Sequence, residues 1–342
     1  MKYISADGGK YNTKLNAFCK ETGKIQRTKF RTKLSEGTFD DDMFEKGTFI
    51  VQVDGGNVYK VGRDAKKEPD VETSKKSEIH KVCILTAAAL ACGEGRTEDA
   101  NIVIGIPLQV CNIPEERIAY KDYILGKPGE KHLVKIKTSP NGNPVECEFS
   151  FGKRLVYPEG IGVLYEYPSR LSGPTGIIDI GNVNTNNLYC DQFMINTDGC
   201  FTDEMGGKVL ISGLAATLTS ELGARVDDNL AASVLCKPYE KRFLTSTKGN
   251  KAMADKSREI IDAYMLEHVQ KIRQRCDTRH WPMEFMSLVC MGGTAKLLAH
   301  EIKIVFGKET FIPEDPEYVN ACGFLKKMCV DDGIEIGKTG GA

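Results

Sequence analysis

The sequence lacks a long apolar segment, a strong charge bias and cysteine pairs at metal-binding spacing. No window approaches the ~20 apolar residues of a membrane-spanning helix, and the apolar stretch after Lys2 is too short for a secretory signal. A formal net charge of −1 argues against a protein that coats nucleic acid, since such proteins carry a strong basic excess. We therefore expect a cytoplasmic protein that binds neither membranes nor nucleic acid directly. We also expect the Lys-Lys pairs at 66–67 and 75–76 to lie in solvated loops.

The 12 cysteines form no Cys-x-x-Cys pair, and none clusters with histidine at metal-ligand spacing. Many lie within apolar runs, among them Cys83, Cys92, Cys290 and Cys322. Such surroundings are typical of buried, reduced thiols in a cytosolic protein. We expect neither a disulfide framework nor a zinc site.

Hydrophobic periodicity predicts strands and helices that alternate along 342 residues, a length that suits two domains or one bilobed unit. The predicted strands are 1–6, 14–19, 48–53, 57–62, 101–106, 131–137, 145–151, 177–181, 187–195 and 286–291. The predicted helices are 78–92, 207–222, 251–276, 296–305 and 316–329, and the segment 162–167 fits either type. The pattern restarts after a break rich in glycine and proline at 172–176.

Two Asp-x-Gly turns lie about half a chain apart, each after a predicted strand. Asp7-Gly8-Gly9 follows the apolar start of the chain, and Asp179-Ile180-Gly181 follows Gly176-Ile177-Ile178. A turn of this kind can direct backbone N–H groups at phosphate oxygens, and its Asp can hold a hydrated divalent cation. The two copies suggest two related lobes that close on one phosphate chain.

A third turn, Gly292-Gly293-Thr294, joins the predicted strand 286–291 to the predicted helix 296–305. Glycines at such a junction allow a ligand to approach the backbone closely. Alone this signal is weak, because Gly-Gly turns are common and an ordinary strand-to-helix turn explains it equally well.

In this order the three turns resemble those of the actin-type ATPase superfamily, which includes sugar kinases and heat-shock chaperone ATPases. The plasmid-segregation actins of bacteria, the ParM group, are the most similar branch. Their first loop reads Asp-x-Gly-x-x-Asn-x-Lys, which Asp7, Gly9, Asn12 and Lys14 match in spacing. Three shorter segments also resemble that group. Gly105-Ile106-Pro107 resembles its Gly-Leu-Pro, and Pro158-Glu159-Gly160 resembles the Pro-Glu-Ser that carries its catalytic glutamate. Residues 318–325 loosely resemble its closing Tyr-x-x-x-Asn-Gly helix.

The resemblance implies an α/β, actin-like two-lobed fold. Each lobe would be a ribonuclease-H-like mixed sheet with flanking helices, and the nucleotide would bind in the cleft between the lobes. The expected divisions are lobe I over 1–172 with an insert at about 31–100, lobe II over 173–315 with a small subdomain at about 223–280, and a C-terminal helix at about 316–330 that packs back on lobe I.

The resemblance also implies roles for the charged residues. Asp7 and Asp179 would hold Mg²⁺ mostly through its waters, which suits an ion that uses few carboxylates. Lys14 would reach the terminal phosphates. Glu159 would position or activate the attacking water, with Glu166 as the alternative and Asp179 as the other catalytic residue. Without the resemblance these residues fit turn-forming aspartates, an exposed lysine and a solvated glutamate.

Nucleotide contacts are expected from the three turns and from a Gly-Gly turn that opens a helix. The full set is Asp7, Gly9, Lys10, Tyr11, Asn12, Lys14, Gly181, Asn182, Val183, Asn184, Gly206, Gly207, Gly292, Gly293 and Thr294. The last three should face the base and the α-phosphate. One residue departs from the family pattern, because relatives usually carry a second glycine where this chain has Val183. Which amides reach the terminal phosphates is therefore open.

Three functions fit the superfamily. The first is a polymerising protein that hydrolyses ATP or GTP with Mg²⁺ and forms dynamic homopolymeric filaments, which segregate plasmid DNA through a ParR-like DNA-binding adaptor. The second is a small-molecule kinase, although no catalytic Asp beside a sugar pocket is evident. The third is a chaperone-like ATPase. We do not favour it, because such a protein works through an attached peptide-binding domain, for which we expect no room after the last predicted helix. We expect the first and keep the kinase as the alternative.

Overall fold

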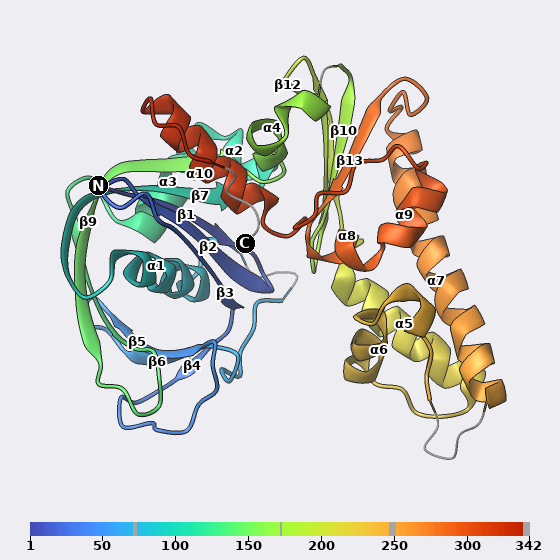
Figure 1. Ribbon diagram of the computed structural model, residues 1–342, viewed down its shortest axis with the longest axis horizontal. Coiled ribbons are helices and arrows are strands. Elements are labelled where there is room, and N and C mark those ends of the chain that lie inside the picture. Colours follow the sequence, from blue (N-terminus) through green and yellow to red (C-terminus); the bar gives the residue numbers. More distant parts are fainter. Residues whose placement is uncertain (71–73, 172, 246–250, 338–342) are drawn as a thin grey trace. The chain divides into compact units, whose positions relative to one another are not determined.

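The computed structural model describes residues 1–70, 74–171, 173–245 and 251–337 (Figure 1). The chain divides into two compact units. Unit 1 comprises Met1–Glu166 and Tyr318–Ala342, and unit 2 comprises Tyr167–Glu317. Each unit contains one sheet with helices packed against it, so the fold is of the mixed α/β class. Among the helices in the described ranges, none has the length and hydropathy needed to cross a membrane.

The sheet of unit 1 has nine strands in the order β3-β2-β1-β7-β9-β8-β5-β6-β4. Its strands are β1 (Lys2–Gly8), β2 (Asn12–Cys19), β3 (Ile25–Arg31), β4 (Leu34–Glu36), β5 (Thr48–Val53), β6 (Val58–Gly62), β7 (Gly95–Ile106), β8 (Lys131–Lys137) and β9 (Val145–Pro158). Its helices are α1 (Glu78–Cys92), α2 (Leu108–Cys111), α3 (Pro114–Leu125), α4 (Gly162–Glu166) and α10 (Val319–Asp331). Three adjacent interior strands, β1, β7 and β9, run parallel to one another.

Helix α1 forms the middle of the unit 1 core, and the sheet curves around it (Figure 1). Its sequence is apolar on nearly every side, with residues such as Ile84, Leu85 and Ala88 fully buried. A helix that is hydrophobic all round is a buried helix. The helix contacts β1 and β2 near one end of the sheet and β5, β8 and β9 towards the other.

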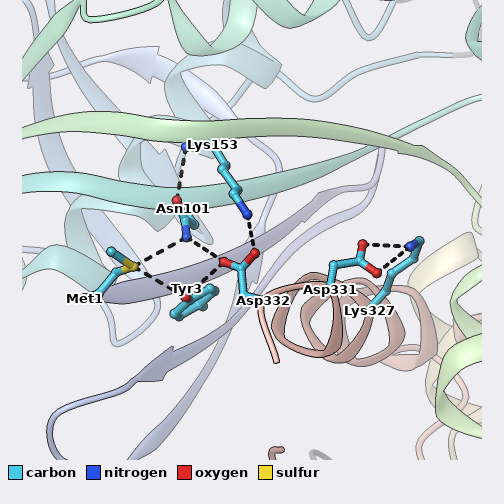
Figure 2. Close-up of polar contacts among 7 residues, drawn as sticks. All are labelled: Met1, Tyr3, Asn101, Lys153, Lys327, Asp331 and Asp332. Carbon is cyan, nitrogen blue, oxygen red and sulfur yellow. Dashed lines mark hydrogen bonds and ion pairs between the residues drawn. The ribbon is translucent and has the colours of Figure 1, made fainter. Parts of the chain in front are cut away.

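Helix α10 packs against β1, β2 and β7 and is fixed at its end by polar contacts (Figure 2). Asp332 follows the helix and accepts hydrogen bonds from the Tyr3 hydroxyl at 3.0 Å and the Asn101 amide at 3.3 Å. Asp332 also pairs with Lys153, and this contact is the main reason that the Asp332 pKa lies below its usual value. These bonds tie the helix end to β1, β7 and β9.

The sheet of unit 2 has four strands in the order β12-β11-β10-β13. Its strands are β10 (Thr175–Ile180), β11 (Thr185–Asp191), β12 (Met194–Asp203) and β13 (Ser287–Met291). Its helices are η1 (Pro168–Arg170), α5 (Gly207–Leu222), α6 (Asp228–Leu235), η2 (Tyr239–Lys241), α7 (Lys251–Thr278), α8 (Gly293–Leu297) and α9 (Ala299–Val305). The long helix α7 buries Ile261, Met265, Val269 and Ile272, a spacing that places one apolar stripe on the core.

The two sheets share one local strand pattern. In unit 1, β1 pairs antiparallel with β2 and parallel with β7. In unit 2, β10 pairs antiparallel with β11 and parallel with β13. The central strand of each set ends at one of the two Asp-x-Gly turns, which confirms the expectation that the halves are related.

Most predicted elements are present, and the exceptions have local causes. The predicted helix 78–92 and the hairpin of 48–53 with 57–62 are confirmed, and 162–167 is helical. The single strand predicted at 187–195 is wrong, because the chain turns at Gln192 and Phe193 between β11 and β12. Both residues have positive φ (46° and 65°), a conformation that hairpin turns usually give to glycine, asparagine or aspartate. Because neither residue is of these types, the sequence does not signal the turn. All 12 cysteines are free thiols, as expected.

Candidate functional site

The two Asp turns have the same backbone geometry. The Gly9 amide donates to the Asn12 carbonyl at 3.1 Å, and the Gly181 amide donates to the Asn184 carbonyl at 2.9 Å. A Cβ on Gly9 would lie 2.8 Å from the Asn12 oxygen, and one on Gly181 would lie 3.0 Å from the Asn184 oxygen. Both turns therefore need glycine at this position for the same reason, and each places its Asp at the end of a central strand.

Asp7 ends the central strand of unit 1 and is 4% exposed. Lys14 lies opposite it on β2, with its Nζ 3.0 Å from the carboxylate. Burial alone would raise the pKa of Asp7, but the positive charges of Lys14 and Lys75 outweigh burial and hold the pKa below its usual value. Asp7 is therefore a carboxylate at neutral pH, which is the form that binds a cation.

Glu159 is brought next to Asp7 by the order of the strands. It follows β9, and Asp7 ends β1; Gly105 lies on β7 between them. A Cβ on Gly105 would lie 3.5 Å from the Asp7 carboxylate and 3.5 Å from Cγ of Glu159. The absence of a side chain at Gly105 thus leaves these two acidic residues facing one site. The alternative, Glu166, ends α4 and is half-buried.

Lys75 pairs with Glu159, and both side chains are about nine-tenths buried. The prediction that the Lys-Lys pair at 75–76 is a solvated loop is therefore wrong for Lys75. The lysine lies 84 residues from its partner in the sequence, and no local pattern marks it. Lys14, Asp7, Lys75 and Glu159 form a charged group of two cations and two anions within unit 1.

The turn that carries Glu159 is held by the C-terminal helix. The Glu159 amide donates to the Ile106 carbonyl at 2.8 Å. The Asn320 side chain accepts from the amides of Gly160 at 3.0 Å and Gly162 at 3.4 Å. A Cβ on Gly162 would come within 2.5 Å of Cα of Asn320, so α4 and α10 cross at van der Waals distance. The backbone around Glu159 is therefore fixed by its neighbours on both sides.

Asp179 is the counterpart of Asp7 in unit 2 and is 8% exposed. Its partner across β11 is Asn186 rather than lysine. Gly292 follows the parallel neighbour β13 with φ of 92°, and a Cβ there would lie 2.5 Å from the Asp179 carboxylate. Glycine is needed at this point of the third turn both for its backbone conformation and to leave room for Asp179.

The second Asp turn is held in place by the start of α5. The amides of Gly206, Gly207 and Lys208 donate to the carbonyls of Val183, Gly181 and Asn182 at 3.1, 3.0 and 2.7 Å. The Thr294 hydroxyl donates to the Gly181 carbonyl at 2.8 Å, and Gly293 is the first residue of α8. Val183, which departs from the family pattern, is 5% exposed and its side chain packs inward.

Two further predicted residues, Lys10 and Tyr11, lie at the tip of the first Asp turn. The Tyr11 ring is 42% exposed, and the Arg31 guanidinium stacks 3.3 Å from its centre. Lys10 lies near His80: burial is the main cause of the low pKa of His80, and the charges of Lys75 and Lys10 add to it. The first turn thus presents a cation and an aromatic face next to Asp7.

The carboxylates fit a cation that keeps most of its waters. Each unit offers one Asp at the end of its central strand, and the described residues hold no group of three His, Cys, Asp or Glu that could bind a metal directly. Mg²⁺ usually binds through one or two carboxylates together with substrate phosphates and waters. The residues present therefore suit a hydrated Mg²⁺ carried by a nucleotide.

No protein-family model matches the chain, and no curated protein matches it in sequence. Solved structures do match along nearly the whole chain. The Alp12 filament structure is 22% identical with a TM-score of 0.70 and covers 97% of this chain and 99% of its own. Ta0583, an archaeal actin homolog, is 18% identical with a TM-score of 0.73 over 97% of this chain and 100% of its own, and one of its structures is a complex with ADP. A ParM from a 15-stranded filament of Clostridium botulinum is 18% identical with a TM-score of 0.66 over 96% of this chain and 99% of its own.

Proposed function

We propose that this chain, which has the actin-like fold, is a nucleotide-dependent polymerising protein that hydrolyses ATP or GTP with Mg²⁺. It acts in the cytoplasm and forms dynamic filaments of its own copies. These filaments segregate plasmid DNA through a ParR-like DNA-binding adaptor. The observation that carries the proposal is the pair of Asp turns with matching backbone geometry, because each such turn can direct backbone N–H groups at phosphate oxygens and offer a carboxylate to a hydrated cation.

The charges of unit 1 suit a polyphosphate. Lys14 and Lys75 are cations beside the buried Asp7, and each can pair with a phosphate oxygen as a point charge. Asp7 and Asp179 would hold the hydrated Mg²⁺, which neutralises charge on the phosphates when it is bound. Glu159 would accept a hydrogen bond from the attacking water and orient it. Because Lys75 pairs with Glu159, we propose that Lys75 leaves Glu159 for the terminal phosphate when nucleotide binds.

The filament is favoured over the small-molecule kinase by the similar structures. Alp12 and the C. botulinum ParM are filament structures, and another ParM structure is of a non-polymerisable mutant. These proteins match the chain over 96–97% of its length and 98–99% of theirs, so the alignment holds no long insertion for a separate substrate domain.

Assembly tests the proposal directly. We expect light scattering and pelletable protein to rise when Mg²⁺ and ATP or GTP are added, and electron microscopy to show filaments. Protein that stays in the supernatant with ATP, GTP and their slowly hydrolysed analogues would refute the filament. Phosphorylation of a sugar without assembly would establish the kinase instead.

A further inference from the structure

The first turn of α1 packs directly behind the first Asp turn. His80 lies in this part of the helix and is fully buried. Its ring carbon Cδ2 is 3.8 Å from the position that a Cβ would take on Gly8, the residue after Asp7. Ile84, one helical turn further, lies 3.1 Å from the same position. The imidazole can approach this closely because Gly8 has no side chain.

One nitrogen of the His80 ring is fixed by a neighbour. Nδ1 lies 2.9 Å from the hydroxyl of Ser77, the residue before α1. Ser77 occupies the N-cap position but makes no side-chain cap bond to the helix, so its hydroxyl serves the histidine instead. A serine hydroxyl that donates to Nδ1 leaves the proton of a neutral imidazole on Nε2.

The other nitrogen, Nε2, is buried and has no hydrogen-bond partner among the described residues. Buried polar atoms are nearly always paired, so an unpaired one in a folded protein calls for a ligand or another explanation. Cδ2, which is bonded to Nε2, is the ring atom nearest Gly8. The unpaired nitrogen therefore lies on the side of the ring that faces the Asp turn.

His80 is neutral at physiological pH. Burial is the main cause, and the charges of Lys75 and Lys10 add to it, so the pKa falls to about 3. A neutral imidazole with its proton on Nε2 can donate a hydrogen bond without adding charge. It also cannot repel the lysines that surround it.

We propose that His80 is a positioning residue whose Nε2–H donates a hydrogen bond to a terminal phosphate oxygen, directly or through one water, in the nucleotide-bound state. This inference rests on the proposed function. The bond forms when Lys75, which contributes to the charge around His80, moves from Glu159 to the phosphate. His80 thus orders the first Asp turn around the triphosphate.

Two conservative variants separate the nitrogens of His80. In H80Q the side-chain amide can take the place of Nε2, whereas in H80N it takes the place of Nδ1 and keeps only the contact with Ser77. Calorimetry would measure binding of a slowly hydrolysed triphosphate with Mg²⁺, using the base that the wild type prefers, and of the diphosphate. T86V is a matched control, because Thr86 is also buried on α1 and its hydroxyl bonds only within the helix.

We expect H80N to lose about 10- to 100-fold in affinity for the triphosphate analogue, the range for one hydrogen bond to a charged group. Its affinity for the diphosphate should be unchanged, and H80Q and T86V should bind both nucleotides as the wild type does. Equal losses for both nucleotides, or wild-type binding by H80N, would overturn the proposal. If the wild type itself binds no nucleotide, the proposed function fails as well.

A spectroscopic measurement on the wild type does not depend on how the variants fold. The chain has five histidines, so ¹⁵N-histidine labelling gives few imidazole signals, and H80Q assigns those of His80. We expect its Nε2 resonance to shift when the triphosphate analogue binds and to remain that of a neutral ring. A resonance that is the same with and without the analogue would contradict the hydrogen bond.

Discussion

The first and second Asp turns have the same backbone but different charges around it. Each closes with a Gly-to-Asn hydrogen bond, and each places a buried Asp at the end of a central strand. The first turn faces Lys14 across β2, whereas the second faces Asn186 across β11. The backbone is thus the shared element, and the cation is specific to the first turn. Under the proposed function, we therefore expect the first turn to supply most of the positive charge and the second to contribute chiefly its carboxylate.

The largest effect on the rate of hydrolysis is expected from Glu159, which lies in unit 1 beside the first Asp turn. E159A should slow hydrolysis by about 10²- to 10⁴-fold, the range for a group that positions or activates water, and leave nucleotide binding largely intact. Filaments of the variant should persist longer, because disassembly would follow hydrolysis. Phosphate release and pelleting over time measure both. Wild-type release would transfer the role to Glu166 or another residue, and lost binding would mean that Glu159 supports the fold.

The two aspartates test whether both turns serve one cation. D7A and D179A should each weaken the binding of Mg²⁺ with nucleotide, because each removes a carboxylate next to a highly charged ion. D7A should also leave Lys14 without its carboxylate partner, so its binding should change more with salt. Calorimetry at two salt concentrations compares the variants. If both bind Mg²⁺ with nucleotide as tightly as the wild type, their assignment is wrong.

Replacing Lys14 by asparagine makes the first turn resemble the second. K14N should lose about 10- to 100-fold in triphosphate affinity, the range for a hydrogen bond to a charged group. Lys14 helps to hold the pKa of Asp7 low, so its loss should raise that pKa. Asp7 can bind a cation only while it is ionised, that is, at a pH above its pKa. Because the pKa of Asp7 is higher in K14N, this variant should lose Mg²⁺ binding at a higher pH than the wild type.

Affinity titrations from pH 4.5 to 8 would measure this shift, with K29N as the control. Lys29 lies on β3 directly opposite Lys14 in the strand register. The control therefore removes a neighbouring positive charge that is outside the turn. An acid limb at the same pH in K14N and the wild type would show that Lys14 does not set the charge of Asp7.

The last effect concerns stability rather than binding, and it comes from the glycines that the two turns share. G9A and G181A each bring a Cβ against an asparagine carbonyl, at 2.8 and 3.0 Å. Overpacking of this kind costs about 1–3 kcal/mol in the free energy of unfolding, with G9A at the higher end since its contact is closer. Chemical denaturation measures the loss, and G173A serves as the control because the Gly173 position is open. Loss in only one variant would show that the turns are not equivalent.

The sequence predicts the turns better than it predicts what surrounds them. Asp7, Gly9 and Asn12 are close in sequence, so their spacing alone signals the closed turn. Lys75 meets Glu159 only because the fold joins residues 84 positions apart. The contact between His80 and Gly8 is equally hidden, since a histidine in a helical apolar run matches an ordinary core position.

The second turn shows the same limit. The Gly-Gly sequence at 206–207 indicates that a helix starts there but not where its amides point. In the structure those amides bond to carbonyls of the second Asp turn. The turn at 192–193 has no glycine, so periodicity alone extends one strand through it. Contacts between distant segments, rather than local propensity, decide each of these features.

Helix α10 contacts the Glu159 turn at one end and is anchored far from that turn at its other end. Asn320 holds the Glu159 turn near the start of the helix, and Asp332 anchors the opposite end to Tyr3 and Asn101. The two lie 12 residues apart, or about 18 Å along a helix at 1.5 Å per residue. The orientation of Glu159 therefore depends on an anchor far from its own turn. If the proposed function holds, we expect substitutions of Asp332 to alter turnover without any contact with the nucleotide.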